Sequence, residues 1–356
     1  MNKYNAIREQ LRVEVDKKQQ GTVDTVLRDV EKKHMQDTFW AQYVKLKNVG
    51  FSPYDCLIVK FLGKRFESAA IPANMKCTID FKKARELSEA GYFYVLHRFY
   101  DYEDILDWMI ENKDIKTISI SVGVNEKDRD FIDKIVEKDV SVDFITIDVA
   151  HGHHVLVKNM ITYIKDRLNV KIIAGNVGTY DAATDLYEWG ADAVKVGLSM
   201  GKSCTTYNCT GVGTPMFSTV ENIANAKFFS WETTIPIIAD GQIREVGDVC
   251  KALVAGANMV MIGSEFAKCE DSPADIIGGP AMGNVDKKVF YGSASSTNKG
   301  HDGYVEGQTV YMDMRNETYI QYFNRINQGI QSCMSYAGVN DITSLVNMEY
   351  QIHTNN

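Results

Sequence analysis

The chain lacks the features of a membrane-bound, secreted or nucleic-acid-binding protein. No apolar run in its 356 residues approaches the ~18 residues that a membrane-spanning helix needs. The polar start, Met1–Asn5, predicts no secretory signal. The formal net charge is −8, which excludes a general nucleic-acid surface. The seven cysteines are odd in number and irregularly spaced, which favours free thiols in a reducing cytoplasm over a disulfide framework.

What the chain does contain is typical of a globular enzyme. It is 45% hydrophobic and 24% charged. Residues 1–50 carry only thinly spread apolar positions among many charged ones, which predicts a solvated helical arm or cap. We therefore expect an N-terminal helical extension over residues 1–66 and a catalytic barrel domain over residues 67–356, which ends in an active-site loop and a C-terminal helix.

From Ser68 onward, apolar strands alternate with amphipathic helical segments. The predicted strands are Ser68–Ala73, Tyr92–Leu96, Thr117–Val122, Asp143–Val149, Lys171–Gly175, Ala193–Gly197, Pro236–Asp240 and Met259–Gly263. The predicted helices include Phe81–Ala90, Tyr102–Asn112, Asp128–Lys138, Val155–Leu168, Asp181–Trp189 and Val246–Ala255, and one from about Glu317 to Ser335 closes the chain. The strands are nearly continuous apolar runs, as in parallel sheets covered by helices.

Eight such units predict a closed (β/α)₈ TIM barrel, which is an α/β fold. A doubly wound open sheet is the alternative, but no GxGxxG motif follows the first strand. A barrel gathers its active-site loops at the carboxyl ends of the strands. Polar and glycine residues do follow those ends, as in Asn74-Met75, His97-Arg98, Asp148–Gly152, Gly175-Asn176, Asp240–Gln242 and Gly263-Ser264.

The sixth strand runs into a glycine-rich loop that contains Cys204, residues 197–213. Such a loop lets the backbone approach a ligand closely, and α/β enzymes place nucleophiles at strand ends. The alternative is a small buried cysteine in a turn, but the neighbouring hydroxyls of Ser203, Thr205 and Thr206 favour the nucleophile. The ends of the seventh and eighth strands predict a phosphate-binding site. For Gly263-Ser264 an ordinary turn with a serine N-cap stays open.

Several ordered motifs carry a family resemblance. They are Ala73–Met75, Tyr94–Phe99, Ser119–Val124, Ile145–His153, Ile173–Thr179, the Cys204 loop, Ile238–Gly241, Met261–Ser264, Tyr291–Ser295 and Val305–Gly307. Together they resemble the GMP reductase branch of the IMP dehydrogenase/GMP reductase family, most closely its bacterial form. The resemblance covers roughly residues 70 to 345, and so many motifs in order are highly specific.

The resemblance implies a cytoplasmic, homotetrameric oxidoreductase of purine nucleotide salvage that converts GMP to IMP and ammonia with NADPH. Cys204 would form a covalent thioimidate at C2 of the guanine ring, with proton transfer by Thr206 and Glu306. The implied substrate-binding residues are Asp240, Gly241, Gln242, Gly263, Ser264, Tyr291, Gly292, Ser293, Ala294, Gly307 and Met75. The implied cofactor-binding residues are Arg98, Asp148, Val149, Ala150, Leu198 and Ser199. Carbonyls of Ser199, Gly201, Cys204 and Tyr207 would hold a monovalent cation such as K⁺.

This sequence departs from the family pattern at Ser199, Met200, Tyr207 and Gln242, where glycine, proline, a basic residue and glycine are usual. Three other functions stay open at this point. One is an IMP dehydrogenase-like oxidation, the second is reduction of a modified or deoxy purine nucleotide, and the third is non-catalytic binding of a purine nucleotide. The preference for NADPH over NADH is also open.

Overall fold

The computed structural model describes residues 57–225, 234–278, 286–292, 294–300 and 306–350. The helical arm predicted over residues 1–50 lies outside the described residues. Seven parallel strands form one sheet in the order β3-β9-β8-β7-β6-β5-β4. They are β3 (Ala70–Pro72), β4 (Ser119–Val122), β5 (Phe144–Asp148), β6 (Lys171–Val177), β7 (Ala193–Val196), β8 (Ile237–Asp240) and β9 (Met259–Ile262).

The eighth position of the barrel is taken by residues 92–96, and here the predicted strand is wrong in detail. Only Leu96 pairs, through a single parallel bridge to Ile120 of β4. Just before the segment, the Gly91 carbonyl accepts a hydrogen bond from the Glu67 N–H, which precedes β3, at 3.0 Å. All five residues of the segment are at most 7% exposed, so burial rather than a hydrogen-bonded ladder holds it in place. The fold is the expected (β/α)₈ barrel-like α/β architecture.

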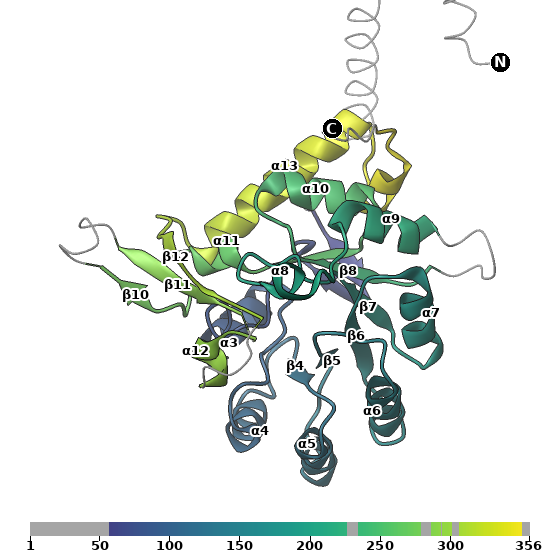
Figure 1. Cartoon of the computed structure of the whole chain (residues 1–356), viewed down its shortest axis with the longest axis vertical. Coiled ribbons are helices and arrows are strands. Elements are labelled where there is room, and N and C mark those ends of the chain that lie inside the picture. The colour runs from purple at the N-terminus through teal and green to yellow at the C-terminus, as the bar shows by residue number, and fades with distance from the viewer. Residues whose placement is uncertain (1–56, 226–233, 279–285, 293, 301–305, 351–356) are drawn as a thin grey trace, which may run out of the picture.

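The helices surround the strands, as Figure 1 shows for α4 to α7. Their bounds are α3 (Phe81–Ala90), α4 (Tyr102–Glu111), α5 (Glu126–Glu137), α6 (Val155–Lys165), α7 (Tyr180–Glu188), α9 (Met216–Asn225), α10 (Val246–Val254) and α13 (Tyr319–Ala337). Side chains set several helix starts; the Asp80 carboxylate, for example, accepts the Lys83 amide at 2.7 Å. The predicted helices are found with ends within three residues, and α9 was not predicted. Across the described parts of the chain, no helix is long and apolar enough to span a membrane.

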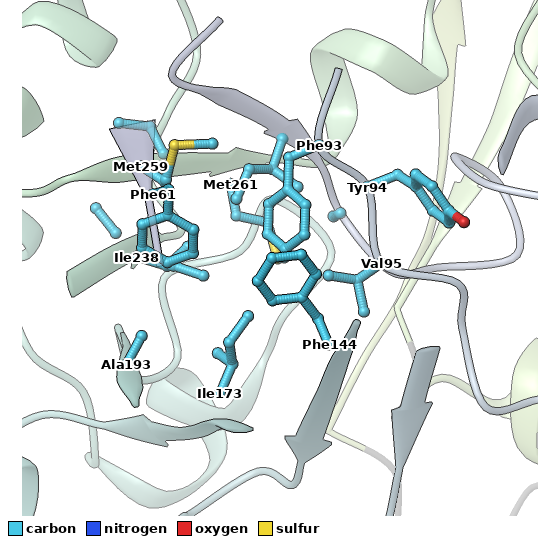
Figure 2. Packing of buried hydrophobic residues seen from close by; sticks show 14 of the residues in the cluster. Phe61, Phe93, Tyr94, Val95, Phe144, Ile173, Ala193, Ile238, Met259 and Met261 are labelled. Atoms are coloured by element: carbon cyan, nitrogen blue, oxygen red, sulfur yellow. The ribbon is translucent and has the colours of Figure 1, made fainter. Parts of the chain in front are cut away.

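A β-hairpin closes the amino-terminal end of the barrel. Its strands, β1 (Val59–Phe61) and β2 (Lys64–Phe66), pair antiparallel, so the end of the predicted helical extension is a hairpin instead. The Phe61 and Phe66 rings lie 5.8 and 4.9 Å from the ring of Phe93, which lies 5.0 Å from that of Phe144. Figure 2 shows Phe61, Phe93 and Phe144 grouped in this part of the core. The hairpin therefore continues the barrel interior.

The chain after β9 is more ordered than the predicted loop. After the short helix α11 (Ser264–Ala267), three antiparallel strands form a second sheet: β10 (Ile276–Ile277), β11 (Lys287–Tyr291) and β12 (Thr309–Asp313). The short helix α12 (Ser296–Lys299) lies between β11 and β12, and the 3-10 helix η3 (Ile342–Asn347) follows α13. Figure 1 shows β10–β12 beside the barrel. This sheet brings residues 291–292, 294–295 and 306–308 to the carboxyl ends of the barrel strands.

The phenylalanine contacts predict where the fold is sensitive to truncation. Phe93 is fully buried, and Phe93→Ala would leave a cavity that costs about 3–5 kcal/mol of unfolding free energy. Urea denaturation would measure this loss. Tyr336→Ala is the control, because Tyr336 is 72% exposed and its truncation should cost less than about 1 kcal/mol. Equal effects of the two substitutions would contradict the assignment of the aromatic cluster to the core.

Candidate active site

Three side chains form a hydrogen-bonded series at the mouth of the barrel. The Cys204 thiol donates to Thr206 Oγ1 at 3.3 Å, and the Thr206 hydroxyl donates to Glu306 Oε2 at 2.7 Å. All three residues are half-buried. Thr206 begins the short helix α8 (Thr206–Thr210), which directs its hydroxyl toward both partners. A thiol, a hydroxyl and a carboxylate in this order can pass a proton from sulfur to a carboxylate oxygen.

Backbone pairing holds Glu306 beside the cysteine loop although 100 positions separate it from Thr206. Cys204 and Gly307 form an antiparallel bridge, and Thr205 N–H donates to the Glu306 carbonyl at 2.9 Å. Gly307 also bridges Ser295, and a Cβ on Gly307 would lie only 2.9 Å from the Ser295 nitrogen. The position therefore needs a glycine, and two neighbours fix its backbone.

A buried lysine lies on β7, the strand that leads into the cysteine loop, and sequence reasoning missed it. Lys195 Nζ lies 2.9 Å from Asp148 Oδ1 and 2.7 Å from Asp240 Oδ2, and its side chain is only 4% exposed. The Asn176 amide donates to the same Asp240 oxygen at 3.0 Å and to the Gly197 carbonyl at 2.8 Å. The available signal was a lysine inside the apolar strand Ala193–Val196, since a buried charge in a strand requires partners.

The two carboxylates keep this lysine charged. Burial lowers the pKa of Lys195, but the charges of Asp148 and Asp240 outweigh it, so the pKa lies well above its ordinary value. Burial raises the pKa of Asp148, yet the nearby ammonium leaves it below its usual range. Gly175 makes room for the lysine, because a Cβ there would lie 2.7 Å from Lys195 Cβ. The arrangement is an ion triad that connects β5, β7 and β8.

The predicted phosphate-binding residues lie next to the cysteine loop. A Cβ on Gly241 would lie 3.1 Å from Met200 Cβ, and one on Gly263 would lie 3.5 Å from Met75 Sδ. Ser264 is buried at the start of α11. The predicted residues from β8, β9 and the first strand end thus meet at the same end of the barrel.

Gln242, where the family usually has glycine, is used differently. It has a left-handed φ of 56°, and its side-chain oxygen accepts the Met216 amide, at the start of α9, at 3.2 Å. Its own N–H donates to the Met200 carbonyl at 3.1 Å. The Gln242 side chain is therefore bonded to the beginning of a neighbouring helix.

The segment after β11 lies over the cysteine loop. A Cβ on Gly292 would lie 3.0 Å from the Ser203 hydroxyl, and the Gly292 carbonyl accepts the Ser295 amide at 3.1 Å. Tyr291 and Ala294 are half-buried. Ser293, also a predicted substrate-binding residue, lies outside the described residues.

Buried polar atoms lie at Arg98, a predicted cofactor-binding residue, and at His97 and Asn176, which were not assigned to the cofactor. His97 Nε2, Arg98 Nε and Asn176 Oδ1 are buried and have no hydrogen-bond partner within the described parts of the chain. Burial, together with the charge of Lys76, lowers the pKa of His97 to about 4, so the ring is neutral near pH 7.

The other residues predicted for the cofactor and the cation differ in exposure. Val149 is half-buried and Ala150 exposed, whereas Leu198 is buried. Ser199 has a left-handed φ of 65°. Of the carbonyls predicted to hold a cation, that of Gly201 accepts the Cys204 amide and that of Tyr207 accepts the Gly211 amide. A carbonyl oxygen has a second lone pair, so these bonds leave room for a cation contact.

Comparison with known proteins agrees with the motifs. Residues 17–355 match the family model described as "IMP dehydrogenase / GMP reductase domain". A GMP reductase of Acidovorax ebreus is 40% identical over 295 residues, which are 83% of this chain and 88% of the relative. One from Bacillus licheniformis is 41% identical over 302 residues, 83% of this chain and 89% of the relative. One from Lactobacillus delbrueckii subsp. bulgaricus is 40% identical over 318 residues, 88% and 93% of the two chains.

The ion triad predicts a pH-dependent loss of stability on removal of its cation. Lys195→Met leaves two neighbouring carboxylates without a counter-charge, which should cost about 3–5 kcal/mol at pH 7. The repulsion raises a carboxyl pKa in the folded variant, so the group takes up a proton as pH falls and the loss shrinks toward pH 5. Urea denaturation at both pH values measures this change. Adding Asp148→Asn should recover part of the loss, and an equal loss at both pH values would contradict the triad.

Proposed function

The chain belongs to the IMP dehydrogenase/GMP reductase family, and we propose that it is a GMP reductase. In this reaction GMP is reductively deaminated to IMP and ammonia with NADPH as the reductant. The observation that carries the proposal is the contact series from Cys204 through Thr206 to Glu306. The series places a nucleophile beside a path for protons. Reductive removal of an amine needs both, because the leaving amine must be protonated.

The first step is the attack of sulfur on the base. The Cys204 thiol gives its proton through the Thr206 hydroxyl to the Glu306 carboxylate, and the thiolate adds to C2 of guanine. The same two residues return the proton to the C2 amine, which leaves as ammonia. A thioimidate between Cys204 and C2 remains. Half-burial of the three residues limits competition from bulk water.

The rest of the site positions the nucleotide. Asp240, oriented by Lys195 and Asn176, accepts hydrogen bonds from the ribose hydroxyls. Gly241, Gly263, Ser264 and Tyr291 bind the phosphate. Gln242 lies beside them, with its N–H bonded to Met200 and its side-chain oxygen to Met216. We assign Met75, Gly292, Ser293, Ala294 and Gly307 to contacts with the base. Fixing C2 against the sulfur in this way lowers the entropic part of the barrier.

The nicotinamide side is assigned to Arg98, Asp148, Val149, Ala150, Leu198 and Ser199. NADPH held by these residues would supply a hydride to C2, and Cys204 would then leave C2 as the thiolate to give IMP. Within the described residues, Arg98 Nε is buried without a hydrogen-bond partner, and Asp148 is held in place by Lys195. A monovalent cation such as K⁺ on carbonyls of Ser199, Gly201, Cys204 and Tyr207 would order the cysteine loop. We assign the enzyme to the cytoplasm as a homotetramer.

A matrix of substrates and cofactors tests the proposed reaction. Purified protein should consume NADPH with GMP and form IMP and ammonia in equal amounts, as measured by absorbance and chromatography. The Cys204→Ala variant serves as control and should show no turnover. Faster reaction of IMP with NAD would instead indicate an IMP dehydrogenase-like enzyme. Preference for a deoxy or modified nucleotide would identify a different substrate, and binding of GMP without turnover would contradict an enzymatic role.

The proton path predicts a second set of variants. Thr206→Ala and Glu306→Gln should each lower kcat roughly 100-fold or more, because each interrupts proton transfer to the leaving amine. Their KM for GMP should change little. Thr206→Ser keeps the hydroxyl and should retain most activity, and Thr205→Ala is the matched neighbour control. A Glu306→Gln enzyme with normal kcat would exclude the carboxylate from the path.

A further inference from the structure

Two cysteines that take no part in the candidate active site lie between helices α10 and α13. These helices run alongside each other on the outside of the barrel, as Figure 1 shows. Cys250 is on α10 and Cys333 is on α13. The Cys250 thiol lies 3.6 Å from the Gly329 carbonyl oxygen on α13. The sulfur of one helix is thus directed at the backbone of the other.

The register of the two helices brings the thiols together. α13 lies against α10 at Gly329, where a Cβ would clash with Val246 of α10. Residues four positions apart lie one above the other on a helix face. Cys250 follows Val246 by four positions, and Cys333 follows Gly329 by four. Cys250 contacts Gly329 and also interacts with Cys333, so the two helices run in the same direction here. The two cysteines therefore face each other one turn beyond the contact of Gly329 with Val246.

The two thiols also interact, and small molecules can reach them. The interaction between the two side chains lowers the pKa of Cys333 and raises that of Cys250. Both side chains are half-buried, whereas Cys77 and Cys269 are buried. A thiolate with a neighbouring thiol is the arrangement that reversible oxidation requires.

We propose that Cys250 and Cys333 are an oxidation site, at which a low-molecular-weight disulfide converts the two thiols into a reversible disulfide that joins α10 to α13. The Cys333 thiolate attacks one sulfur of the small disulfide and expels the first small thiolate. The Cys250 thiol, losing its proton, then attacks the Cys333 sulfur and expels the second. The two cysteines lose two electrons and two protons, and the oxidant becomes two small thiols.

The bond would fasten the C-terminal helix to the part of the barrel that carries the nucleotide-binding loops. α10 connects β8, which ends at Asp240, to β9, which is followed by Gly263. A link from α10 to α13 restricts the unfolded chain over a long loop and should raise Tm. The oxidation does not depend on the chemistry of Cys204, so its test is separate from that of the proposed reaction.

Peptide mapping of the full-length protein tests the site. Reduced protein is incubated with oxidised glutathione near pH 7.5, remaining thiols are alkylated, and a tryptic digest is analysed without reductant. The expected product is the peptide of residues 245–251 linked to that of residues 326–356, lost after dithiothreitol. Recovery of both peptides alkylated, or of each carrying its own glutathione, would overturn the proposal.

Two substitutions of one residue give a matched comparison. Cys250→Ser keeps a hydrogen-bond donor beside Cys333, whereas Cys250→Ala removes it, and neither can form the disulfide. With glutathione, both variants should stop at a mixed disulfide on Cys333. The pH midpoint of Cys333 alkylation should stay near that of the wild type in the serine variant and rise in the alanine variant. The same midpoint in both variants would mean that the two thiols do not interact.

Discussion

The active-site end of the barrel depends on one buried ammonium group between two carboxylates. Lys195 pairs with Asp148 on β5 and Asp240 on β8, so three strands share a single charged contact. Burying this charge without both partners would cost several kcal/mol. The contact also explains a local feature, since Gly175 on the intervening strand leaves the space through which the lysine passes. The triad joins the two sides of the site, because Asp240 faces the nucleotide and Asp148 faces the cofactor side in the proposed assignment.

The reactive groups are assembled by backbone pairing rather than by the barrel alone. Cys204 and Thr206 follow β7, while Glu306 comes from a segment that the sheet β10–β12 returns to the barrel mouth. The bridge between Cys204 and Gly307 sets the distance from hydroxyl to carboxylate. A barrel with this cysteine loop but without the second sheet would hold a thiol and no proton acceptor beside it.

Strong hydrophobic periodicity made most of the fold predictable from sequence, and the exceptions have physical causes. The continuous apolar strands and the helices between them were found, and the strand ends located Cys204 and Asp240. Lys195 was missed because a single polar residue does not disturb an apolar run. Helix α9 was missed because its serine, threonine and asparagine residues have weak helix propensity. Residues 92–96 were predicted as a full strand because apolar runs indicate burial, whereas their pairing depends on tertiary context.

Two backbone bridges fix Gly307, and with it the position of the neighbouring Glu306. Ser295 on one side and Cys204 on the other hold the glycine, so both of these backbone bridges come from positions outside residues 296–305. We expect a change of length between Ser295 and Glu306 to leave these bridges, and with them the backbone of the proton acceptor, in place. Related enzymes can therefore diverge there in length and composition, and acquire new contacts at the mouth of the barrel, while the reacting groups keep their geometry.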